Sequence, residues 1–167
     1  MKTAAQWIEK LGLKQHPEGG YYKEEYRSDE EIGKTQLPPR YNGARNFATS
    51  IYFLLKSNEF SSFHRIKSDE TWHFYQGTQL ELLVLKHDGT LVSYLLGDDF
   101  ESGERLQITI PRNHWFAARV KQKLSFALLG CTVAPGFHFE DFELASRNQL
   151  TEQFPQHRNI IEKLTFA

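Results

Sequence analysis

From Phe47 to Ala134 the chain is a series of short runs with β-type patterning, and this regular spacing is the feature that most limits its fold. The pattern predicts strands near 47–55, 60–66, 70–76, 79–86, 90–96, 105–110, 115–120 and 124–134. Turn-forming groups such as His87-Asp88-Gly89 separate the runs. Aromatic residues make up 14% of the chain, which also favours β structure. Evenly spaced short strands indicate a β-sandwich or barrel.

The flanking segments have different patterns. We expect a short helix from Thr3 to Leu11, ended by Gly12, and a first strand from Tyr21 to Arg27. Residues 28–45 are polar and are expected to form a long loop. Near the other end, the pattern predicts helices over 147–154 and 159–164.

Length and charge set the broad class. The chain has 167 residues and a net charge of −1, which suits one domain over 1–167 and gives no field to hold nucleic acid or anionic lipid. One cysteine, Cys131, excludes an internal disulfide and is expected to be a buried, unreactive side chain. There is no signal-peptide pattern and no apolar run of the roughly 20 residues that cross a bilayer. We therefore expect a soluble, cytoplasmic protein.

Candidate chemistry lies on the strands over 60–66 and 70–76. Strict alternation places Ser62 and His64 on one face, and Glu70 and Trp72 on one face of the next strand. If both faces point inward, His64 and Glu70 share one interior, and burial should raise the pKa of Glu70.

Two stretches resemble the cupin motifs. In the run from Phe63 to Gly77, His64, Glu70 and Gly77 match the first motif, but Ile66 replaces its second histidine. In the run from Gly103 to Phe116, Pro111 matches the second motif, while Phe116 replaces its metal-binding histidine.

The chain resembles most closely the uncharacterised fifth cupin family. This resemblance is carried by His16-Pro17-Glu18-Gly19-Gly20-Tyr21-Tyr22, by 64–77, by Trp115-Phe116-Ala117-Ala118, by 130–137 and by Asp141-Phe142-Glu143-Leu144. It implies a double-stranded β-helix of the RmlC-like jelly-roll type, usually dimeric and similar in shape to sugar-nucleotide epimerases. A homodimer is therefore expected.

Three functions remain open. The first is a sugar or sugar-nucleotide isomerase in which His64, held by Glu70, acts as base and Tyr75 or Tyr52 returns the proton. The second is a non-catalytic protein that binds a carbohydrate or nucleotide. The third is a metal-dependent enzyme with a reduced ligand set, His64 and Glu70. No cofactor is predicted, because two ligands seldom hold a metal tightly.

Other side chains are expected to contact the ligand. These candidates are Trp72, Ser62, Phe53, Arg65, Trp115 and Asp141. The aromatics at 137, 139 and 142 either fold over the mouth of the barrel, with Asp141 and Glu143 facing the ligand, or form a packed cap with solvated carboxylates. His16 is expected at the surface.

Overall fold

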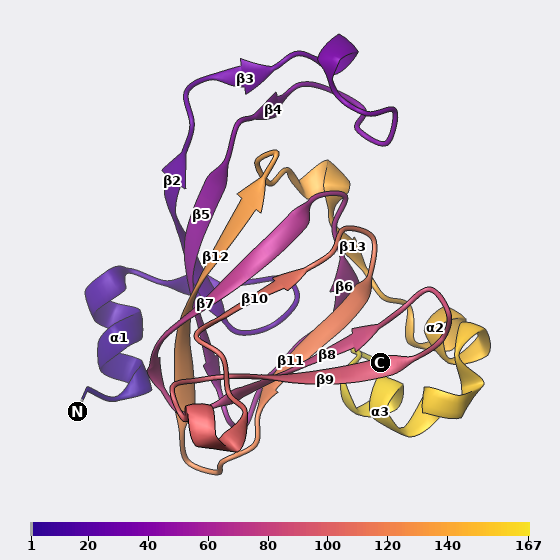
Figure 1. The fold of residues 1–167 in the computed structure, drawn as a ribbon. Coiled ribbons are helices and arrows are strands. Elements are labelled where there is room, and N and C mark those ends of the chain that lie inside the picture. The colour runs from indigo at the N-terminus through magenta and orange to yellow at the C-terminus, as the bar shows by residue number, and fades with distance from the viewer. Residues whose placement is uncertain (1) are drawn as a thin grey trace.

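Two antiparallel sheets form the body of the protein (Figure 1). The computed structural model describes residues 2–167. One sheet has the order β1 (Lys14–Gln15), β2 (Tyr21–Arg27), β5 (Thr49–Lys56), β12 (Phe126–Ala134), β7 (Asp69–Gly77) and β10 (Gln107–Ile110). The other has the order β13 (Glu143–Leu144), β6 (Phe60–Arg65), β11 (Trp115–Val120), β8 (Leu80–Leu85) and β9 (Leu91–Leu96). The expected all-β jelly roll is confirmed, and the strands predicted from residue 47 onward are correct to within two residues.

The main apolar core lies between the two sheets, because alternate side chains of both point inward. It joins Trp72 and Leu129 of the first sheet to Leu82 and Phe116 of the second. Apolar side chains therefore fill the centre of the sandwich, and the cavity between the sheets lies beside this core.

Short helices cover the outer faces of the sheets. Helix α1 (Ala4–Leu11) has the expected capping box at Thr3 and a left-handed Gly12 at its end, and it packs on Leu54 and Leu128. At the other end of the chain, α2 (Arg147–Gln153) and α3 (Arg158–Lys163) cover Phe63 and other side chains of the second sheet (Figure 1). No helix among the described residues is long and apolar enough to span a bilayer.

Residues 28–45 are more ordered than the expected loop. They include the two-stranded pair β3 (Glu31–Ile32) and β4 (Arg45–Asn46), which lies beyond the end of the first sheet in Figure 1. Tyr41 is fully buried, and its hydroxyl lies 2.8 Å from Ser68 Oγ. Contacts with a distant turn therefore order a segment that is polar in sequence.

Strand β6 departs from strict alternation. Its register with β11 shifts between the pairs Phe116–His64 and Ala118–Ser61. This bulge turns Ser61, not Ser62, towards the same side as His64. Ser62, which alternation predicted on the His64 face, instead donates a hydrogen bond to the carbonyl of Leu164 and lies outside the cavity lining.

Candidate functional site

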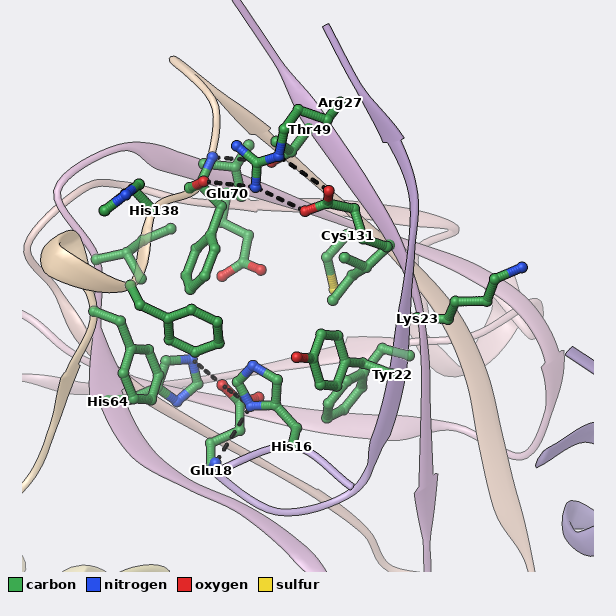
Figure 2. Close-up of a pocket in the computed structure, with 18 of the residues that line it drawn as sticks. His16, Glu18, Tyr22, Lys23, Arg27, Thr49, His64, Glu70, Cys131 and His138 are labelled. Carbon is green, nitrogen blue, oxygen red and sulfur yellow. Dashed lines mark hydrogen bonds and ion pairs between the residues drawn. The ribbon is translucent and has the colours of Figure 1, made fainter. Parts of the chain in front are cut away.

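A cavity of about 620 Å³ opens between the sheets, and register explains much of its lining (Figure 2). Arg27 pairs with Thr49, Thr49 with Val133, and Val133 with Glu70. These four residues form one row across four adjacent strands, and all of them line the cavity. The next inward positions of the same sheet supply Trp72 and Cys131.

The carboxyl group of Glu70, on the cavity wall formed by the first sheet, has a shifted pKa. Its side chain is buried, and burial raises its pKa from the ordinary 4.5 to about 7. The Trp72 indole N–H and the Cys131 thiol lie near enough to offset part of that rise. The indole N–H itself finds no hydrogen-bond partner among residues 2–167. Glu70 therefore populates both protonation states near neutral pH, on the wall of the cavity.

His64 and Glu18 form a buried pair on the opposite side of the cavity (Figure 2). His64 Nε2 lies 3.1 Å from Glu18 Oε2, and His64 Nδ1 lies 2.7 Å from the carbonyl oxygen of Ser62. Ser61 donates a hydrogen bond of 2.8 Å to the other carboxyl oxygen of Glu18. Glu18, and not Glu70, is therefore the carboxyl group that holds His64.

The contacts of this pair determine where its proton resides. A carbonyl oxygen only accepts hydrogen bonds, so Nδ1 of His64 carries the ring proton. In a neutral ring Nε2 is then an acceptor, and a proton must lie between it and Glu18. Burial raises the pKa of Glu18 well above its ordinary value and lowers that of His64 to about 3. The pair is accordingly a protonated Glu18 that donates to a neutral His64.

A glycine turn holds Glu18 in place. Gly19 has φ +107°, and a Cβ there would collide with the carbonyl oxygen of Phe60. The Glu18 carbonyl accepts a 2.7 Å hydrogen bond from the backbone N–H of Ser62. Close packing of this turn on β6 therefore requires glycine and carries Glu18 into the cavity.

His16, in the same turn, also lines the cavity. Its Nδ1 accepts a hydrogen bond of 3.3 Å from the Glu18 backbone N–H, which leaves the ring proton on Nε2. Only 7% of its side chain is exposed, and burial lowers its pKa to about 4. The expectation that His16 lies at the surface is wrong, because this turn folds between the two sheets.

The segment of residues 137–142 closes one side of the mouth, as expected for its aromatics: Phe137, Phe139 and Phe142 all line the cavity. Asp141 does not. Its carboxylate accepts two hydrogen bonds from Arg45, of 2.6 and 2.7 Å, and both side chains are buried. Asp141 therefore lies outside this cavity and anchors the mouth segment through Arg45.

Of the other predicted residues, Phe53 and Trp72 line the cavity and three do not. Trp115 faces the C-terminal helices, and Arg65 stacks over its ring at 4.3 Å while pairing with Glu143. Tyr75 projects from the outer face of β7 and is 53% exposed. In each case alternation directs the side chain away from the cavity, so these three residues lie outside its lining.

Tyr52, the alternative to Tyr75, is also on the outside. It packs with the cluster under α1 and makes an edge contact with Tyr75. Neither tyrosine is able to return a proton to a ligand in the cavity. Tyr22 on β2 does line it, and its hydroxyl is directed into the space (Figure 2).

The residues present do not fit a metal centre of the cupin type. Ile66 and Phe116 occupy two of its histidine positions, and neither side chain has a donor atom. Among residues 2–167, no group of three or more His, Cys, Asp and Glu side chains is arranged to hold a metal ion. No step of the chemistry below is assigned to a metal.

Sequence reasoning missed the residues that come from β2 and the preceding turn: His16, Glu18, Tyr22 and Arg27. The signal was present in His16-Pro17-Glu18-Gly19-Gly20, where two glycines beside two ionisable groups indicated a close backbone approach.

Two face-to-face sheets around an interior polar cavity define a jelly-roll protein. Residues 5–145 match the family model described as Cupin superfamily (DUF985), and the chain belongs to that family, which confirms the resemblance. The structure is similar to that of protein SO0799 from Shewanella oneidensis, with TM-score 0.91 and 38% identity over 100% of this chain and 99% of the other.

Two further relatives extend the comparison. The uncharacterized protein YML079W of Saccharomyces cerevisiae is 30% identical over 148 residues, which cover 81% of this chain and 72% of the yeast protein. Oxalate decarboxylase from Bacillus subtilis has TM-score 0.53 at 15% identity, over 90% of this chain and 36% of the other, which shows a shared fold alone.

Proposed function

We propose that the protein is a proton-transfer enzyme of the isomerase or epimerase type, acting on a small carbonyl compound such as a sugar derivative. The observation that carries this proposal is the placement of two protonic groups on opposite sides of one cavity. Glu70 lies on the first sheet, and the Glu18–His64 pair lies across the space from it (Figure 2).

Each group has a role that its protonation state allows. Ionised Glu70 removes a proton from the carbon next to the carbonyl, because a pKa of about 7 makes it a base that functions at neutral pH. Protonated Glu18 donates its proton to the carbonyl oxygen, and the products are a neutral enol, a protonated Glu70 and an ionised Glu18. Reversal of both transfers, with the proton returned to the other face or the neighbouring carbon, restores the enzyme.

This proposal moves the base from His64, where the sequence placed it, to Glu70. Both nitrogens of His64 are engaged, by Ser62 and Glu18, whereas Glu70 lines the cavity with a pKa of about 7. His64 then acts through Glu18, by positioning its carboxyl group through the 3.1 Å contact between Nε2 and Glu18 Oε2.

Deuterium exchange tests the proposal. The protein is incubated in deuterated water with aldoses, ketoses and keto-sugar nucleotides, and deuterium at the carbon next to the carbonyl is measured by NMR. We expect uptake that falls by at least about 100-fold in Glu70→Gln. Tyr75→Phe, on the outer face, is the matched control and should exchange normally. Absence of uptake across the whole panel, or full activity of Glu70→Gln, contradicts the proposal.

A non-catalytic binding protein is the second candidate. It is favoured by the aromatic rings around the cavity and by the few polar groups among them, such as the Tyr22 hydroxyl, since such walls are typical of small-molecule sites. A sugar that raises the melting temperature without deuterium exchange would support this candidate instead. The homodimer stays a prediction, to be tested by light scattering.

A further inference from the structure

The charges around the cavity are unevenly distributed. Its buried ionisable groups are the carboxyls of Glu18 and Glu70, the thiol of Cys131 and the imidazoles of His16 and His64. Of the described residues that line the cavity, the lysines and arginine are all exposed ones on the first two strands: Lys14, Lys23 and Arg27. The interior thus holds two acids and neither a lysine nor an arginine.

The exposed cations are already engaged. Arg27 donates Nε and Nη2 to Glu24, another lining residue, and its Nη1 lies 2.7 Å from Asn46 Oδ1. Lys23 pairs with Glu25 at 3.1 Å, and in Figure 2 its side chain points away from the cavity. His138, at the mouth, accepts from the backbone N–H of Glu140. Lys14, the remaining lining cation, is exposed and lies over the Tyr22 ring. A phosphate or carboxylate deep in the cavity would therefore meet the carboxyl groups of Glu18 and Glu70 with no lysine or arginine buried beside them.

Aromatic rings surround the same space. The lining rings are Tyr22, Phe53, Trp72, Phe137, Phe139 and Phe142. One cation already lies over the Tyr22 ring, because Lys14 Nζ is 5.2 Å from the ring centroid. Ring faces attract ammonium groups, most strongly where water is excluded.

We propose that the natural ligand of this cavity carries a positive charge: it is a small amine whose ammonium group pairs with Glu70 and lies against the aromatic wall. The inference names the substrate class for the proposed enzyme and rests on that proposal only in using the same cavity. An ammonium group pairs with the ionised form of Glu70, which is also the form that acts as the base, so the buried carboxylate gains a partner. Hydroxyl groups on the ligand would be met by the Tyr22 hydroxyl, which is directed into the cavity (Figure 2).

Three compounds with one carbon chain test the charge preference: glucamine, sorbitol and gluconate, which carry an ammonium, a hydroxyl and a carboxylate at the same carbon. Binding is measured by calorimetry at about pH 8, above the pKa of about 7 of Glu70. We expect glucamine to bind about tenfold more tightly than sorbitol, and gluconate to bind most weakly. None of the three has a carbonyl group, so the result is independent of whether the protein catalyses proton transfer.

Two variants connect the preference to the cavity. Glu70→Gln should abolish the advantage of glucamine over sorbitol, while Glu143→Gln, an exposed carboxylate outside the cavity lining, should retain it. Circular dichroism verifies that both variants fold, and the ranking of the three compounds on the unaltered protein stands without either variant. The inference is overturned if gluconate binds best, if sorbitol matches glucamine, if glucamine fails to bind at millimolar concentrations, or if folded Glu70→Gln still prefers glucamine.

Discussion

Replacing Asp141 with alanine should destabilise the protein far more than an ordinary loss of an ion pair. Asp141 accepts from Arg45 at 2.6 and 2.7 Å, and only 3% of either side chain is exposed. Lys67 Nζ lies 3.5 Å from the same carboxylate. Asp141→Ala therefore leaves the buried guanidinium of Arg45 with only the more distant and exposed carboxylate of Glu140, at 3.6 Å.

The expected size of the effect follows from that burial. Breaking a buried pair by removing one partner costs about 3–5 kcal/mol of the free energy of unfolding. For a chain of 167 residues each kcal/mol lowers the melting temperature by about 2–4 °C, so a fall of about 6–20 °C is expected. Urea and thermal unfolding, followed by tryptophan fluorescence and circular dichroism, measure both quantities.

Glu143→Ala is the matched control. Glu143 pairs with Arg65 at 2.7 Å, but its side chain is 55% exposed, so its loss should cost less than about 1 kcal/mol. Equal and small losses in the two variants would refute the reasoning, because they would mean that burial of the Arg45–Asp141 pair has no energetic consequence.

Three further predictions concern the cavity. Between pH 4.5 and about 7 the folded protein keeps the proton on Glu70 while the unfolded chain releases it, so the free energy of unfolding falls as pH rises through this window. Glu70→Gln should reduce that fall by about 3 kcal/mol, as measured by urea unfolding at several pH values. Gly19→Ala should cost more than about 1 kcal/mol and weaken ligand binding, whereas Gly103→Ala, at φ +79° in open space, should leave binding intact by calorimetry. Tyr22→Phe should weaken binding in the same assay, and Tyr75→Phe should not. Loss of binding in Tyr75→Phe, or a pH dependence unchanged in Glu70→Gln, would contradict these assignments.

Most of the fold was predictable because its strands and helices depend on patterns among neighbouring residues. Alternation within a strand placed Glu70 and Trp72 on one face of β7, and both line the cavity. Thr3 and Gly12 marked the two ends of α1 through their own backbone and side-chain chemistry. Such features need only neighbouring residues, so one sequence suffices to find them.

The rest of the site depends on contacts between distant residues. A bulge in β6 exchanged the roles of Ser61 and Ser62, and pairing with β11 sets that bulge. Glu18 lies 46 positions before His64 in sequence, and it contacts His64 because the turn that carries Glu18 folds between the sheets. Asp141 is an anchor because Arg45, 96 positions away, meets it. Local sequence patterns contain no information about these distant partners.

The central claim is that Glu70 is a buried acid–base group opposite the Glu18–His64 pair. NMR titration of protein labelled with ¹³C at the glutamate carboxyl carbons measures this directly. We predict one carboxyl resonance that titrates near the pKa of about 7 and disappears in Glu70→Gln, and a second, from Glu18, that titrates well above the ordinary range and disappears in Glu18→Gln. Titration of every glutamate within the ordinary range would contradict the account.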